Sequence, residues 1–97
     1  MGARLGDVHG AAVSPAMERC LRRLAALREA NGSESYAGFA AIGRRTGLDR
    51  ATVRRAVRAL ARRGFAEYQR GLYTYEGRFA GAGYRITDAG YWAAHHA

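Results

Sequence analysis

Residues 39–60 contain two short amphipathic helix patterns that are separated only by Gly47-Leu48-Asp49. In the first pattern, over residues 38–46, Phe39 and Ile42 recur at helical spacing. The second pattern runs from Arg50 to about Arg63 and repeats apolar residues every three or four positions, namely Val53, Ala56, Val57 and Leu60. Because glycine tolerates a left-handed backbone and aspartate caps a following helix, the link predicts a tight turn. Two helices joined so closely must cross and pack against each other.

The small and apolar residues around this turn are those that a helix-turn-helix requires. Gly43 lies four positions before Gly47, where the two helices must approach closely. Leu48, Val53 and Val57 then supply apolar contacts that fix the second helix across the first. The pattern therefore predicts a helix-turn-helix.

A further helix is predicted on the N-terminal side. Ser14-Pro15 combines an N-cap residue with proline at the first helical position, and apolar residues repeat at helical spacing up to Asn31-Gly32. Residues 33–36 then form a short link that could pair as a minimal strand. Residues 1–13 are rich in Gly and Ala and lack periodicity. We therefore expect a flexible arm over 1–13 and one folded domain over 14–97.

After Gly64 the apolar pattern changes from helical to alternating. Residues 65–70 and 83–86 read as two strands, and Glu76-Gly77 marks a turn between them. Thr87-Asp88 then caps a short C-terminal helix. The fold class predicted is α+β: three helices, a two-stranded hairpin and a short terminal helix. Its predicted core is Leu21, Leu24, Phe39, Ile42, Leu48, Val53, Val57, Leu60, Phe65, Tyr84, Ile86 and Trp92.

The charge of the chain is strongly positive and is concentrated in one region. The 97 residues carry a formal net charge of +8, and all 16 basic residues are arginine. Between Arg44 and Arg70 there are nine arginines against only Asp49 and Glu67. The predicted second helix of the pair turns Arg50, Arg54, Arg55, Arg58 and Arg62 away from its apolar stripe. Like charges four residues apart repel one another, so a polyanionic partner is the simplest compensation.

The run FAAIGRRTGLDRATVRRAVRALARRGF, followed by a hairpin and GYRITDAG, resembles the winged helix-turn-helix transcription regulators, including MarR-like and phage-borne forms. This resemblance implies sequence-specific binding of double-stranded DNA, with residues 50–63 as the recognition helix in the major groove and the hairpin as the wing. The residues expected to read bases are Arg50, Ala51, Thr52, Arg54 and Arg55. Those expected to hold phosphates are Arg44, Arg45, Arg58, Arg62, Arg70 and Arg78.

A homodimer is also expected, through the helix of residues 14–30 and the C-terminal segment with Tyr91 and Trp92, because one module offers little specific interface. Two other functions remain open. The domain could dock on an acidic protein as an adaptor or anti-activator. Alternatively, aromatic residues of the hairpin, Tyr73 and Tyr75 foremost, could stack on RNA or single strands.

No catalytic, metal or cofactor site is expected. Glu67 and Glu76 have no carboxylate or histidine partner for acid–base chemistry, and Asp49 is explained as a helix cap. His9, His95 and His96 do not form a ligand set with Cys20. The single cysteine, expected to be a small buried residue, fits a reducing cytoplasm. No apolar run is long enough for a membrane span.

Overall fold

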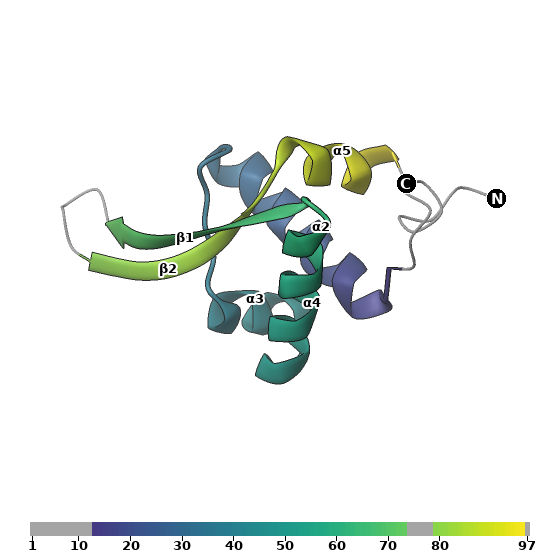
Figure 1. The fold of residues 1–97 in the computed structure, drawn as a ribbon, viewed down its shortest axis with the longest axis horizontal. Helices are drawn as coiled ribbons and strands as arrows, with labels where there is room; N and C mark the ends of the chain where they lie inside the picture. The colour runs from purple at the N-terminus through teal and green to yellow at the C-terminus, as the bar shows by residue number, and fades with distance from the viewer. Residues whose placement is uncertain (1–12, 74–78, 97) are drawn as a thin grey trace.

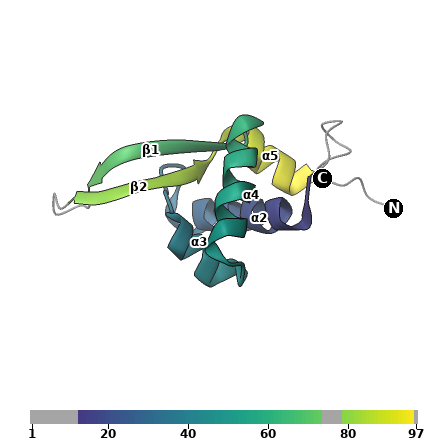
Figure 2. The ribbon, with the colours of Figure 1, turned by 60° about the horizontal axis from the view of Figure 1, so that its bottom comes forward.

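The computed structural model describes residues 13–73 and 79–96 and has the predicted α+β architecture (Figure 1). The elements are α2 (Pro15–Asn31), α3 (Phe39–Thr46), α4 (Arg50–Arg62), β1 (Ala66–Tyr73), β2 (Phe79–Ile86) and α5 (Asp88–His96). The helices form one body, and the β1–β2 hairpin projects away from it (Figures 1 and 2). The two strands are longer than predicted. The Glu76-Gly77 turn and the residues Tyr75 and Arg78 lie outside the described residues.

The predicted helix caps are present. Ser14 and Asp49 each accept a hydrogen bond from the backbone amide three residues on, at 3.1 Å and 2.9 Å respectively. Thr87 Oγ1 does the same at the start of α5, at 3.1 Å. Such bonds satisfy amides that have no acceptor within the first turn of a helix. The starts of these three helices therefore follow from local sequence.

One apolar core joins α2, α3, α4, the base of the hairpin and α5. Its largest fully buried side chains are Leu21, Leu24, Ile42, Leu60, Ile86, Val53, Val57 and Cys20. Phe39 and Leu48 are only half-buried and pack at the edge of this core. Burial raises the pKa of the Cys20 thiol to about 11, so this cysteine stays protonated and behaves as a small apolar residue.

The prediction that Trp92 belongs to the core is wrong, since 50% of this residue is exposed. The inward face of α5 is formed instead by the small residues Gly90, Ala93 and Ala94, which let the helix approach its neighbours closely. At 100° per residue, Trp92 falls on the outer side of that face. Its ring stacks on His96, with 4.6 Å between ring centroids.

The hairpin is tied to the helical body at its base. β1 and β2 pair antiparallel, with Tyr68 opposite Tyr84, and the register becomes irregular after Gln69. Tyr84 also exchanges two backbone hydrogen bonds with Ala37, at 2.8 Å and 2.9 Å. The minimal strand expected over residues 33–36 thus occurs at Ala37. This third backbone pairing anchors the wing beside the start of α3.

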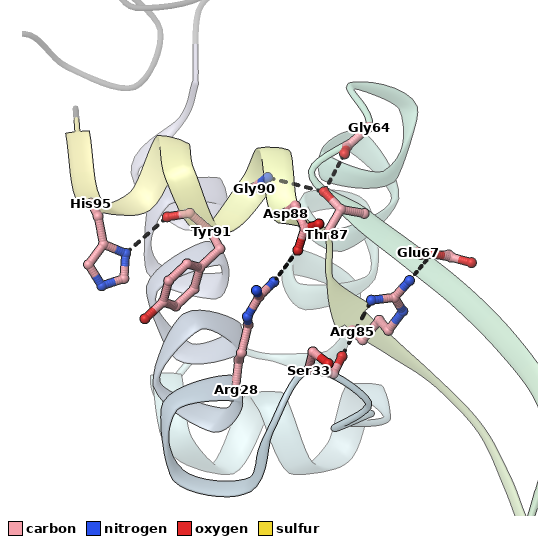
Figure 3. Close-up of polar contacts among 10 residues, drawn as sticks. All are labelled: Arg28, Ser33, Gly64, Glu67, Arg85, Thr87, Asp88, Gly90, Tyr91 and His95. Carbon is pink, nitrogen blue, oxygen red and sulfur yellow. Dashed lines mark hydrogen bonds and ion pairs between the residues drawn. The ribbon is translucent and has the colours of Figure 1, made fainter.

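Helix α5 is held against α2 by polar contacts as well as by its small residues (Figure 3). Arg28 on α2 lies 2.9 Å from the carboxylate of Asp88, and its guanidinium lies over the Tyr91 ring. Glu29 accepts hydrogen bonds from His95 and then from Tyr91. These bonds hold the pKa of Glu29 below its ordinary value. The Tyr91 carbonyl and then Glu29 raise the pKa of His95.

Candidate nucleic-acid interface

Helices α3 and α4 form the tight helix pair that the sequence predicted. Gly47 ends α3 with a left-handed φ of 76°, and its amide donates to the Gly43 carbonyl at 2.9 Å. A Cβ at Gly43 would lie 3.1 Å from the Leu48 carbonyl oxygen, so the turn leaves little room for a side chain there. The Asp49 cap then starts α4 at once. These local constraints set the crossing of the two helices.

Helix α4 buries its apolar stripe and turns its arginines outward. Val53, Val57 and Leu60 are fully buried against the other helices. The opposite side is exposed and consists of Arg50, Ala51, Arg54, Arg55, Arg58 and Arg62. Within the described residues, none of these arginines takes part in an ion pair. The helix therefore presents a cationic face without ion pairs, and the ribbon places this helix next to the start of the wing (Figure 2).

The two acidic residues of this region are both engaged elsewhere. Asp49 accepts hydrogen bonds from the amide and the hydroxyl of Thr52, and these bonds lower its pKa. Glu67 forms an ion pair with Arg85 at 2.6 Å (Figure 3). The charge of Arg55 also lowers the pKa of Asp49, but neither carboxylate forms an ion pair with an outward arginine of α4 among the described residues. The positive charge of the helix remains available to an external anion.

Two of the residues expected to read bases stand at the edges of the exposed face of α4. Thr52 is half-buried, and its hydroxyl already donates to Asp49 at 2.8 Å. Arg50 is exposed, with its guanidinium 5.9 Å from the Phe39 ring centroid on the side of α3. Ala51, Arg54 and Arg55 are exposed between these edges. The structure thus brings all five to the first turns of one helix, but with different surroundings.

The residues expected to hold phosphates come from three elements. Arg58 and Arg62 continue the exposed face of α4, and Arg44 and Arg45 are exposed in the last turn of α3. Arg70 is exposed on β1, whereas Arg78 lies outside the described residues. The described members therefore lie on α3, α4 and β1, and Arg44 and Arg45 line a hollow with Arg23 and Leu27 of α2.

Sequence analysis did not single out Tyr68, which is 47% exposed and lies beside Arg50 on the hollow between α4 and the wing. Its ring packs on Tyr84, with 5.1 Å between centroids. Cross-strand pairing puts both tyrosines on one face of the hairpin. The alternation along β1 could have indicated that Tyr68 shares a face with Tyr84. It could not have indicated that the helices leave the Tyr68 ring half exposed.

Comparison with known proteins decides the family. The model of the IclR helix-turn-helix domain matches residues 16–70, which include α2, α3, α4 and the start of β1. The chain belongs to this family. As an IclR-type domain it is a sequence-specific DNA-binding unit of the transcription-regulator class, as the sequence predicted. No protein with a curated description matches it.

Solved structures share the winged-helix fold with this IclR-type domain. A candidate DNA-binding protein from Ralstonia eutropha JMP134 aligns with a TM-score of 0.66 and 20% identity over 87% of this chain and 95% of its own. The PcaV transcriptional regulator of Streptomyces coelicolor, solved with its natural ligand, aligns with a TM-score of 0.66 and 24% identity over 95% of this chain and 58% of its own. A MarR family regulator from Neisseria meningitidis aligns with a TM-score of 0.57 and 23% identity over 84% of this chain and 50% of its own. The chain thus spans 58% of the PcaV regulator and 50% of the MarR family regulator.

Two other properties of the IclR-type domain complete the description. Across residues 13–73 and 79–96, no three or more His, Cys, Asp or Glu residues are grouped so that they could hold a metal ion. In the same part of the chain, no helix has the length and apolar character needed to cross a membrane.

Proposed function

We propose that the domain binds double-stranded DNA with α4 in the major groove and the β1–β2 wing over the neighbouring backbone. The observation that carries this proposal is the exposed arginine face of α4, whose arginines form no ion pair among the described residues. A helix fits the major groove, and guanidinium groups match both phosphates and the edge of guanine. A protein with this role works in the cytoplasm and not as an enzyme.

The first turns of α4 are proposed to read bases and its later turns to hold the backbone. Arg54 and Arg55 extend from the exposed face near the small Ala51, which lets the helix approach the base edges. Arg50 and Thr52 flank them, and Asp49 fixes the Thr52 hydroxyl. The proposed phosphate contacts are Arg44, Arg45, Arg58, Arg62, Arg70 and Arg78.

Replacing Arg54 with alanine tests the base-reading role. A bidentate contact to guanine contributes about 1–3 kcal/mol of discrimination against other bases. We therefore expect Arg54→Ala to weaken binding to a duplex selected from a random library by roughly 10- to 100-fold, and to random duplex by much less. Fluorescence anisotropy with both labelled duplexes measures the two losses. Equal losses on both duplexes would contradict base reading by Arg54.

The functional unit is proposed to be a homodimer of domains that span residues 14–97, with residues 1–13 as an arm. The dimer surface is proposed to combine α2, over residues 14–30, with α5. Support comes from the half-exposed Trp92, which stands on the outer side of α5. Sedimentation equilibrium at micromolar concentration is expected to give twice the chain mass of 10.5 kDa. A single-chain mass, or a dimer that is unaffected by Trp92→Glu, would contradict this surface.

A further inference from the structure

A hollow of about 350 Å³ lies where the starts of α3 and α4 meet the base of the wing. Phe39 lines it from α3, Arg50 from α4, and Tyr68 and Tyr84 from the two strands. Of these residues only Arg50 also belongs to the outward arginine face, so it lies where the hollow and that face meet. The hollow is therefore continuous with the face of α4 that is proposed to enter the groove.

The wall of the hollow is a fixed group of aromatic rings. Phe39 and Tyr84 stack with 5.6 Å between centroids, and Tyr68 lies against Tyr84 at 5.1 Å. The backbone pairing of Tyr84 with Ala37 holds this group to the start of α3. Tyr84 is nearly buried, whereas Tyr68 keeps 47% of its surface exposed at the rim. A partner that enters the hollow thus meets an apolar ring face with a hydroxyl group at its edge.

The open side of the hollow carries positive charge. The Arg50 guanidinium lies over the Phe39 ring, 5.9 Å from its centroid, and forms no ion pair within the described residues. Arg70 is exposed two residues beyond Tyr68 along β1. An apolar ring face beside the Arg50 guanidinium complements a ligand that alternates apolar and anionic groups. The sugar–phosphate backbone of DNA has this alternation.

We propose that this hollow holds the sugar–phosphate backbone of the DNA strand that borders the major groove read by α4. A deoxyribose packs on the Tyr68 ring, the Tyr68 hydroxyl donates to a phosphate, and Arg50 pairs with that phosphate or the next. The proposal rests on the proposed function, because it requires α4 in the groove. A helix with its first turns in the groove brings the bordering strand past its N-terminus, which here is the mouth of the hollow.

This proposal changes the expected role of Arg50. The sequence placed Arg50 among the residues that read bases, but its guanidinium sits over Phe39 at the side of α4. A contact to the backbone is independent of sequence. Arg50 and Tyr68 therefore add affinity for any duplex, while discrimination stays with Arg54 and Arg55.

The test compares Tyr68→Ala, Tyr68→Phe and Arg50→Ala with the wild-type protein in fluorescence anisotropy. Gln69→Ala is the matched control, because alternation puts that exposed side chain on the opposite face of β1. The probes are a labelled random-sequence duplex, a selected duplex and a single strand. We expect Tyr68→Ala to lower the affinity for both duplexes equally, by about tenfold, which corresponds to 1.4 kcal/mol. Tyr68→Phe is expected to lose less affinity, about threefold, because it keeps the ring. Gln69→Ala is expected to bind both duplexes as the wild type does.

For Arg50→Ala we expect equal losses on both duplexes and a salt dependence shallower by about 0.9 in the log–log slope, the value for one phosphate. This variant and Tyr68→Phe keep the test decisive if melting curves show that Tyr68→Ala does not fold. A second variant, Arg58→Glu, reverses a charge on the outward face of α4. Normal duplex binding by the Tyr68 variants, together with weakened duplex binding by Arg58→Glu, would overturn the backbone site in the hollow but leave the proposed function standing. Failure of the wild-type protein to bind duplex would instead overturn the proposed function.

Two other outcomes also count against the backbone site. A Tyr68→Ala variant that loses single-strand binding and keeps duplex binding would assign the hollow to unpaired bases. An Arg50→Ala variant that loses affinity for the selected duplex only would return Arg50 to base reading.

Discussion

Reversing the charge of Arg58 is expected to weaken binding of random duplex DNA by roughly 100-fold. A charge-assisted hydrogen bond contributes about 1.5–3 kcal/mol, and the new carboxylate also repels the phosphates. Arg58 is exposed in the middle of α4 and has no ion pair among the described residues. Its substitution therefore leaves the free energy of unfolding nearly unchanged. Anisotropy with a labelled duplex measures the affinity, and thermal melting checks the fold.

Arg22→Glu is the matched control for Arg58→Glu, since each reversal lowers the net charge by the same amount. Arg22 is exposed on α2, and its charge acts on His95 of α5, away from the outer face of α4. The substitution breaks an exposed ion pair with Glu18, which contributes little to stability. Because Arg22 lies on the helix proposed for the dimer surface, sedimentation equilibrium first checks that the variant keeps the wild-type mass. With that mass kept, we expect Arg22→Glu to reduce duplex affinity only slightly, through the loss of net charge. Equal losses from both reversals would mean that binding follows total charge and not the α4 face.

Placing a methyl group at Gly90 is expected to destabilise the domain by about 3 kcal/mol. A Cβ on Gly90 would clash with the backbone carbonyl oxygen of Phe65, which belongs to the link between α4 and β1. Backbone cannot move aside as a side-chain tip can, so α5 would have to shift. That shift would strain the hydrogen bond from Thr87 to the Gly64 carbonyl (Figure 3). Thermal unfolding should show a drop of roughly 12–24 °C in Tm for a domain of this size.

Gly38→Ala provides the control for Gly90→Ala. A Cβ on Gly38 would meet only one neighbouring atom, the Ala82 carbonyl oxygen at 3.6 Å, which is an ordinary contact. Its expected cost is below about 1 kcal/mol, from the poorer N-cap that alanine makes at the start of α3. A Gly90→Ala protein with wild-type Tm would contradict the close packing of α5 on the α4–β1 link.

The helical frame could be predicted from the sequence because its determinants are local. Ser14 and Asp49 cap the helices that immediately follow them, and Gly47 closes the turn through its own backbone conformation. The arginine face of α4 follows from the position of Val53 and Val57 on the opposite side. In each case the residue and its structural effect lie within one or two helical turns.

Features that depend on packing between distant elements could not be predicted in the same way. The sequence predicted Trp92 in the core, but the small Ala93 and Ala94 form the side of α5 that faces inward. The exposure of Tyr68 depends on how far α3 and α4 cover the wing. The surroundings of Arg50 depend on the position of Phe39 across the helix turn. These relations appear only when the elements are assembled.

The most direct test of the central claim is a salt series of wild-type binding to a labelled random-sequence duplex, followed by fluorescence anisotropy. Binding through the arginine face should release counterions from roughly five phosphates, which gives a slope of log affinity against log salt of about −4 to −5. A slope of that size is the result that this account predicts. Absence of duplex binding even at low salt would contradict it and would assign the arginine face to an acidic protein partner.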